Sequence, residues 1–209
     1  MISIGILLAG CGLYDGTEVA EAVLSALALE RAGAKPVFLS IDGAQMHTVD
    51  HMTGSEAEVE ARDILSESAR VARGRIKSLK EHQGAVLMAL IIPGGHGTVK
   101  NLMTNFARLG APRELHPEVH ALLTGLQKRR VPIGSISLGR TLVQTFIGEP
   151  LSQDDMNLSA GEIIVDDTRR LVFTPGFLTG ASLAEVATGI DRMVRKVLEM
   201  SANPLEVID

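Results

Sequence analysis

The chain has 209 residues, with 20 Lys and Arg against 25 Asp and Glu, so its formal net charge is −5. Hydrophobic residues make up 45% and charged residues 22%, which excludes disordered and fibrous classes and predicts a globular protein with a core. Nucleic-acid binders need a basic face and, for single strands, stacking side chains; the net acidity and the 3% of aromatic residues argue against that class.

Location, domain number and metal content are predicted from equally simple features. The single cysteine, Cys11, excludes an internal disulfide and a Cys-rich zinc site. Residues 2–9 form an apolar run without a preceding basic segment, so we expect a buried strand and no signal peptide. No stretch approaches the ~20 apolar residues of a membrane span. We therefore expect one domain over 1–209 in a cytoplasmic protein, with no membrane or nucleic-acid partner and no metal.

Short apolar runs alternate with longer stretches of helical periodicity, which is typical of βαβ units around a parallel sheet. The predicted class is α/β, with a mostly parallel sheet and an added β-hairpin. In chain order we expect a strand at 3–9, a helix at 17–31, a strand at 36–41, a helix at 56–73, a strand at 86–92, helices near 99–109 and 114–129, a strand at 132–136, a short helix from 139, a hairpin of strands 162–165 and 171–174, and a helix from Ser182 to 200.

Three glycine-bearing turns follow predicted strands, at 10–16, at 93–97 and around Ser137. Ligands of open parallel sheets bind beyond the carboxyl ends of the strands, where these turns lie. Glycine there allows close backbone approach, so N–H groups can face an anion or a developing oxyanion. Such turns also occur for packing alone, so by themselves they are weak indicators of function.

The third turn carries a more specific pattern. Ser137 lies between an apolar strand and a helix start, with the small residues Ser135 and Gly139 two positions away on either side. This spacing is typical of a nucleophile elbow, whose sharp turn excludes bulky neighbours. The alternative is that Ser137 only caps the following helix. A catalytic serine also needs a base to remove its proton.

Several residues could supply that base or contact a ligand. His96 lies on a turn expected to face the same crevice, whereas His47 and His51, four residues apart in a predicted loop, lack a third metal ligand. Glu18 and Glu21 open the first helix, where acidic residues also favour the helix dipole without any function. Glu21 lies among apolar positions, so we expect it to point inward with a raised pKa.

Six segments carry a pattern that can be compared with known families: Gly10–Glu18, His51–Gly54, Ile92–Gly95, Lys100–Leu102, Val165–Asp167 and Thr188–Asp191. Together they resemble the ElbB-like branch of the ThiJ/PfpI superfamily, which is related to class I glutamine amidotransferases. The resemblance covers nearly the whole chain. It implies a flavodoxin-like three-layer sandwich, a homodimer, no cofactor, and an elbow cysteine hydrogen-bonded to a glutamate of the first helix. Glu21 matches that glutamate better than Glu18 does.

The chain departs from this pattern at the elbow. Where the family has glycine, two residues and cysteine, this chain has Gly134 followed by Ser137, and residues 138–140 read Leu-Gly-Arg where Ile-Ala-Pro is typical. A helix N-terminus and a glutamic acid can lower the pKa of a thiol enough to ionise it, but a serine needs a general base. Cys11 is expected to fill a strand-end turn.

Two functions remain open at this point. The first is glyoxalase-type conversion of glyoxal to glycolate without glutathione, in which Ser137 attacks a small dicarbonyl and Glu21 or Glu18 carries the proton. The second is a catalytically inactive protein that binds a small anion or acts through dimer-mediated interactions. Hydrolysis or amidotransfer rests on fold analogy alone. Predicted oxyanion donors are the N–H groups of Gly94, Gly95 and Leu138, and predicted substrate or anion contacts are His96, Asn101 and Arg140.

Overall fold

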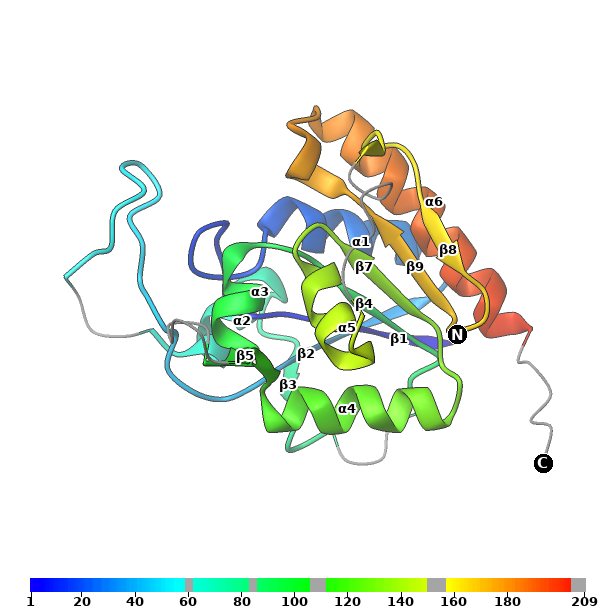
Figure 1. Ribbon diagram of the computed structural model, residues 1–209, viewed down its shortest axis with the longest axis horizontal. Helices are drawn as coiled ribbons and strands as arrows, with labels where there is room; N and C mark the ends of the chain where they lie inside the picture. Colours follow the sequence, from blue (N-terminus) through cyan, green and yellow to red (C-terminus); the bar gives the residue numbers. More distant parts are fainter. Residues whose placement is uncertain (59–61, 83–85, 106–111, 150–156, 204–209) are drawn as a thin grey trace.

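A seven-stranded sheet in the order β3-β2-β1-β4-β7-β9-β8 forms the centre of this computed structural model (Figure 1). The structure describes residues 1–58, 62–82, 86–105, 112–149 and 157–203. Neighbouring strands are parallel except for the antiparallel β8–β9 hairpin. The strands are β1 (Ser3–Leu7), β2 (Lys35–Ser40), β3 (Ile76–Ser78), β4 (Ala89–Ile92), β7 (Ile133–Ile136), β8 (Ile164–Asp166) and β9 (Leu171–Thr174).

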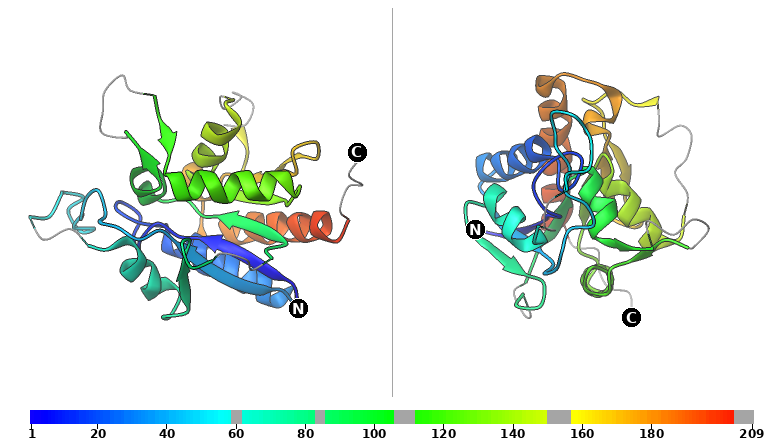
Figure 2. Two further views of the ribbon diagram at one scale, coloured as in Figure 1. Left: turned by 90° about the horizontal axis from the view of Figure 1, so that it is seen from below. Right: turned by 90° about the vertical axis from the view of Figure 1, so that its left-hand side faces the viewer.

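Helices cover both faces of this sheet, which confirms the predicted three-layer α/β architecture with its added hairpin (Figure 2). α1 and α6 pack on one face, and α4 and α5 on the other. A separate two-stranded sheet is formed by β5 (Met103–Thr104) and β6 (Glu114–Leu115). The helices are α1 (Val19–Arg31), α2 (Ile64–Val71), α3 (His96–Asn101), α4 (Pro117–Lys128), α5 (Gly139–Ile147), the short 3₁₀ helix η2 (Gly176–Thr179) and α6 (Leu183–Ala202).

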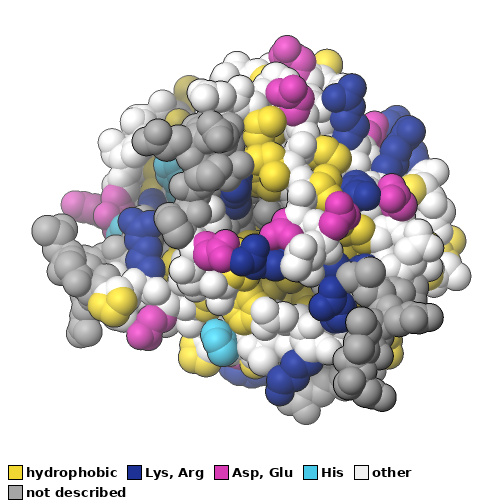
Figure 3. All heavy atoms as spheres, turned by 45° about the vertical axis from the view of Figure 1, so that its right-hand side comes forward, with side chains coloured by type: hydrophobic (Ala, Val, Ile, Leu, Met, Phe, Trp, Pro, Cys, Tyr) yellow, Lys and Arg dark blue, Asp and Glu magenta, His cyan; other side chains and the backbone are white. Residues whose placement is uncertain are grey.

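The central strands are buried on both faces, which explains their continuous apolar sequence. In β1, Ile4 and Ile6 belong to the core beneath α1 and α6, while Leu7 belongs to the core beneath α4 and α5. None of the helices within the described ranges is long and apolar enough to cross a bilayer. On the face drawn in Figure 3, acidic and basic side chains are interspersed, and apolar side chains lie between them.

The chain reverses its direction of travel across the sheet between β1 and β4. From β1 it moves outward to β2 and β3, and it then returns to place β4 on the other side of β1. Such a switch point leaves a crevice beyond the carboxyl ends of the two strands, because their connections leave on opposite sides. The turns after β1, β4 and β7 therefore meet at one edge.

Three predicted helices have clearly different bounds in the structure. The helix predicted at 56–73 begins only at Ile64, where the Asp63 carboxylate caps it by accepting a hydrogen bond from the Ser66 N–H at 2.7 Å. The helix predicted near 99–109 begins earlier, at His96, and ends at Asn101. Residues 106–111 lie outside the described ranges, as does the tail from 204. The helix predicted at 114–129 begins at Pro117, because Glu114–Leu115 pair with Met103–Thr104 as strands. β3, β5 and β6 were not predicted, because two or three residues are too few to show a strand pattern.

α6 is packed so closely that its glycine, Gly189, has no room for a side chain. A Cβ atom at Gly189 would overlap the carbonyl oxygen of Ala160, whereas a Cβ at Gly125 in α4 would meet nothing within 4 Å. We expect Gly189→Ala to lower the free energy of unfolding by about 1–3 kcal/mol, since the backbone must shift to accommodate the methyl group. The control Gly125→Ala should raise it by about 0.5–1 kcal/mol through helix propensity. Urea unfolding measures both, and equal stability of the two variants would contradict the packing argument.

Candidate functional site

Ser137 occupies a strained turn between β7 and α5. Its φ angle is 52°, in the left-handed region that side chains rarely adopt. Its N–H donates to the Thr174 carbonyl at 3.1 Å, and its own carbonyl accepts from the Arg140 N–H at 3.2 Å. The N-cap of α5 is Leu138, which makes no side-chain cap. The alternative of a simple helix cap therefore loses its support, and the geometry is that of an elbow.

Glu21 lies directly beside Ser137 although it comes from α1. Its carboxyl group lies beside the Ser137 side chain, since both groups adjoin the space that a Cβ atom at Gly94 would take, and Oε2 accepts from the Gly94 N–H at 2.7 Å. Oε1 accepts from the Phe177 N–H at 3.3 Å. Glu21 is completely buried. Three turns from different parts of the chain therefore converge on one carboxyl group.

Burial raises the pKa of Glu21 to about 8, and the nearby Glu18 carboxylate adds to this increase. Hydrogen bonds from Gly94, Phe177 and Ser137 oppose it, because they favour the ionised form. At neutral pH the group is therefore mostly a protonated acid. It becomes a base within the pH range that an enzyme can use, which is what a proton-transfer residue requires.

Two glycines make room for this pair. A Cβ atom at Gly94 would overlap the Ser137 hydroxyl and would lie 2.9 Å from Glu21 Oε2. A Cβ atom at Gly176 would overlap Glu21 Oε1. Gly176 and Phe177 were not predicted as site residues. The signal that could have indicated them is a Pro-Gly turn directly after a strand of the same sheet, at the edge where the other turns gather.

Glu18 has a different position from Glu21. Its carboxylate caps α1 by accepting a hydrogen bond from the Glu21 N–H at 2.6 Å, and its own N–H donates to the Gly94 carbonyl at 2.9 Å. Of the two predicted acids, Glu21 therefore contacts Ser137, while Glu18 fixes the start of α1 and adds negative charge nearby.

The predicted oxyanion donors differ in what their N–H groups bind. The Gly94 N–H donates to Glu21 and is therefore not available to a substrate. No acceptor among the described residues takes the N–H groups of Gly95 or Leu138. Gly95 has a φ angle of 96° and caps α3, and Leu138 follows Ser137 directly. These two donors flank the elbow without a partner.

Asn101 stabilises the neighbouring loops. Its amide nitrogen donates to the carbonyls of Ala9 and Asp15, both at 2.9 Å, and its oxygen accepts from the Met46 N–H at 2.9 Å. Both amide hydrogens are thus used by the main chain. Asn101 holds the turn after β1 in place and has no free donor for the substrate contact that we predicted.

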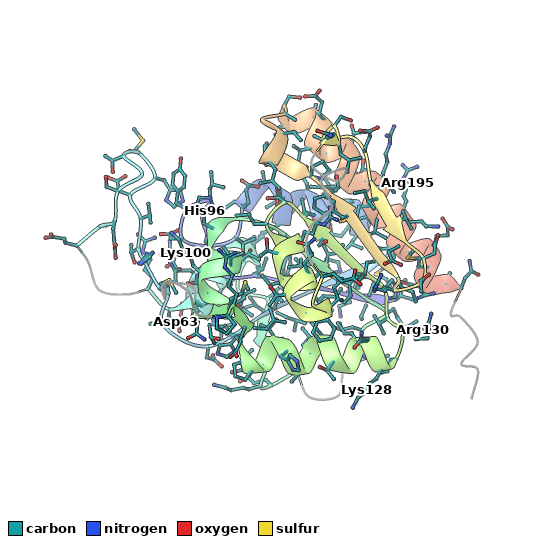
Figure 4. The ribbon with its side chains drawn as sticks, viewed as in Figure 1. Asp63, His96, Lys100, Lys128, Arg130 and Arg195 are labelled. Carbon is teal, nitrogen blue, oxygen red and sulfur yellow. The ribbon has the colours of Figure 1, made fainter. Side chains whose placement is uncertain are left out.

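His96 lies at the exposed start of α3 (Figure 4). Its ring centroid is 5.9 Å from that of Tyr14, which in turn lies 5.1 Å from the ring of His51. Burial and the neighbouring Lys100 lower the pKa of His96, so its ring is neutral at pH 7. His51 and His47 lie in loops, and no group of three or more potential metal ligands occurs in the described ranges.

Arg140 and Cys11 lie in surroundings that differ from the elbow. The guanidinium of Arg140 lies 4.2 Å from the Phe173 ring centroid, over β9. It lines a cavity together with Ser135 and Glu149, on the hairpin side of α5.

The pKa of the half-buried Cys11 thiol is raised by burial and by the Glu67 carboxylate, which disfavours the reactive thiolate.

Curated relatives match over most of the chain. It is 34% identical over 223 residues to the mitochondrial ES1 protein homolog of Rattus norvegicus, covering 95% of this chain and 84% of that protein. It is also 34% identical over 223 residues to the mitochondrial glutamine amidotransferase-like class 1 domain-containing protein 3 of Homo sapiens, covering 95% and 83%. No family model matches the chain.

Solved structures show the same architecture. An isoprenoid biosynthesis protein with an amidotransferase-like domain from Ehrlichia chaffeensis has a TM-score of 0.86 and 26% identity, covering 95% of this chain and 99% of that one. A ThiJ/PfpI domain protein from Brachyspira murdochii has a TM-score of 0.56 and 15% identity, covering 98% of each chain, which is a likeness of fold alone.

The comparison corrects one prediction. We expected a cytoplasmic location, whereas the relatives from rat, human and Danio rerio are all named as mitochondrial proteins. The expectation was wrong because it rested on a low cysteine content and on the absence of a secretory pattern. Those features describe the redox environment of a protein and do not distinguish one reducing compartment from another.

The raised pKa of Glu21 predicts a specific pH dependence of stability. Its ordinary pKa is 4.5 and its folded pKa is about 8. The folded state therefore binds more protons between these values, and stability present below pH 4.5 is lost as the pH rises towards 8. We expect Glu21→Gln to flatten this decline, by on the order of 1–4 kcal/mol between pH 5 and 8. Urea unfolding across this range measures it, with the exposed Glu30→Gln on the same helix as control. An unchanged slope in Glu21→Gln would contradict the assignment.

Proposed function

This chain belongs to the ES1 and glutamine amidotransferase-like class 1 family within the ThiJ/PfpI superfamily, and on that premise we propose that it is a glyoxalase-type enzyme that converts glyoxal to glycolate without glutathione. In this proposal Ser137 stands where the family has its nucleophilic cysteine. The observation that carries it is the position of the Ser137 hydroxyl beside a buried glutamic acid whose pKa is about 8. A serine needs a base in contact with its hydroxyl, and Glu21 is in that position.

The first step is attack on one aldehyde carbon of glyoxal. The Ser137 Oγ forms the new C–O bond while its proton moves to ionised Glu21, and the carbonyl electron pair becomes an oxyanion. The unpartnered N–H groups of Gly95 and Leu138 are the donors available to stabilise that charge. The proton then passes from Glu21 to the oxyanion, which gives a hemiacetal bound to the serine.

The second step moves hydrogen between the two carbons. Ionised Glu21 removes the C–H proton of the hemiacetal carbon while the second carbonyl oxygen takes up a proton, which gives an enediol. The proton on Glu21 then passes to the second carbon, and the hydroxyl of the first carbon releases its proton as it becomes the ester carbonyl. The first carbon is thereby oxidised to an ester and the second is reduced to an alcohol, so no external oxidant is needed. Water then cleaves the ester, which releases glycolate and restores the Ser137 hydroxyl. Only a small substrate fits this scheme, since Ser137 is 8% exposed.

The direct test measures glycolate formed from glyoxal by the purified protein. Product is measured, because dicarbonyls also disappear by reaction with lysine and arginine side chains. We expect kcat/KM to rise as the pH increases through about 8, since Glu21 is then ionised. Ser137→Ala should lower it at least about 100-fold. The buried neighbour Ser135 supplies a matched control, Ser135→Ala. Equal rates for Ser137→Ala and the wild type would refute the role of Ser137.

A second function is anion binding without catalysis. It is favoured by the serine at position 137, because this site can ionise the thiol of a cysteine more readily than the hydroxyl of a serine. Ser137→Cys separates the two. If the wild type forms no glycolate while Ser137→Cys does, the chain has a binding site in which catalysis has been lost. If both proteins form glycolate, the proposal of a catalytic Ser137 is supported.

We also propose that two copies of this chain form a homodimer, through an exposed apolar stripe on α1. Val19, Val23 and Leu27 are 38%, 49% and 38% exposed and lie four residues apart, on one face of the helix. Light scattering after gel filtration should give twice the mass of the chain. Val23→Lys should shift the protein to the monomer, and the exposed control Met52→Lys should not. A monomeric wild type would refute the proposal.

A further inference from the structure

A small cavity lies at the opposite end of β7 from Ser137. Its volume is about 200 Å³, and its lining includes Ile133, the first residue of β7, and Leu171, the first residue of β9. Ser137 follows the last residue of β7, so the strand separates this cavity from the elbow. Arginines contribute strongly to its lining, through Arg130, Arg169 and Arg170.

Arg170 is an unusual residue to find in this position, because it is only 5% exposed. Its guanidinium donates to the carbonyls of Met200 and Asn203 at the end of α6. Its Nε is buried and has no hydrogen-bond partner. Within the described ranges no carboxylate forms an ion pair with it. Arg170 is thus a buried cation whose hydrogen bonds to the described residues go to main-chain carbonyls.

Arg130 adds a second cation without a counter-charge. Its guanidinium donates to the Thr168 carbonyl at 3.3 Å, and no ion pair joins it to a carboxylate in the described part of the chain. Figure 4 shows it just beyond the C-terminal end of α4. Burial lowers the pKa of Arg170, the charge of Arg130 lowers it further, and Asp167 acts in the opposite direction.

The neighbouring Arg169 differs from these two arginines, because it has carboxylate partners. It forms ion pairs with Asp166 and Glu149 on the surface. A buried cation ordinarily has such a partner, because desolvation of an unpaired charge is costly. Buried Arg170 and exposed Arg130, neither of which has an ion pair among the described residues, therefore leave the cavity with positive charge and with donors that a bound anion can use.

The remaining walls are largely apolar, since Val131, Phe146 and Ile147 also line the cavity. We propose that this cavity binds a small organic anion, whose carboxylate is held by Arg130 and Arg170 and whose short hydrocarbon part packs on Val131 and Phe146. About 200 Å³ is less than the ~300 Å³ at which pockets for drug-sized ligands begin, so the ligand is a small monocarboxylate. The inference does not depend on the proposed reaction, because neither Ser137 nor Glu21 lines the cavity.

Isovalerate, its neutral amide isovaleramide, and inorganic phosphate are suitable probes. Calorimetric titration of the full chain measures affinity, and amide NMR shifts report where each probe binds. We expect one isovalerate per chain, with shifts concentrated at 127–133 and 168–171. Isovaleramide should bind at least about tenfold more weakly, because it lacks the charge that the arginines recognise.

Arg130→Gln should weaken isovalerate binding at least about tenfold. The matched control is Arg129→Gln, which removes the same charge from the neighbouring residue; Arg129 does not line the cavity and donates to the Gly125 carbonyl. Its affinity should stay within about twofold of the wild type. Because Arg170 also holds the end of α6, the test relies on Arg130, which is exposed and whose loss leaves α6 intact.

Four results would overturn the proposal. They are no saturable binding of isovalerate up to about 50 mM, equal binding of isovaleramide, equal weakening in the two arginine variants, and NMR shifts located elsewhere. Binding of phosphate without isovalerate would overturn the organic part of the assignment. Activity of the elbow is not needed for any of these readouts, so failure of the proposed reaction and failure of this site are distinguishable.

Discussion

The hydrogen bonds to the Glu21 carboxyl group hold the candidate site together. This one side chain connects α1 with the turn after β4, with η2 and with the elbow after β7. A carboxyl group with no exposure is stable there only because main-chain N–H groups reach both of its oxygens. The glycines at 94 and 176 follow from this arrangement, since any side chain at either position would occupy the space of the carboxyl group.

The same burial determines the chemistry that the site offers. It holds the pKa of Glu21 near 8, so the group is an acid at neutral pH and a base slightly above it. A thiol in this position would need little help to ionise, whereas the Ser137 hydroxyl must give its proton to a neighbour during attack. Glu21 is the described side chain in contact with that hydroxyl, which makes its protonation state the control on any reaction at Ser137.

The sheet separates two regions of different charge. At the carboxyl ends of the strands lie the acids Glu18 and Glu21 with the unpartnered N–H groups of the turns. At the amino end of β7, Arg130 and Arg170 leave positive charge in an apolar cavity. Glu21 in the first region and Arg170 in the second are polar groups that the surrounding fold holds away from water. Such groups are costly in a folded protein unless a partner or ligand satisfies them, so they identify the places where ligands are expected.

The sequence by itself determined the α/β class, the positions of the longer strands, the hairpin and the elbow, because apolar runs and glycine turns are local patterns. It also indicated Glu21, whose apolar neighbours in α1 mark a buried helix face. Only the tertiary structure decided that Phe177 donates to this glutamate, that Gly94 is used by it, and that Asn101 and Glu18 hold loops and a helix start. The sequence also did not predict the cavity lined by Arg130 and Arg170. Those contacts join residues far apart in the chain, and no local pattern records which turns the sheet brings together.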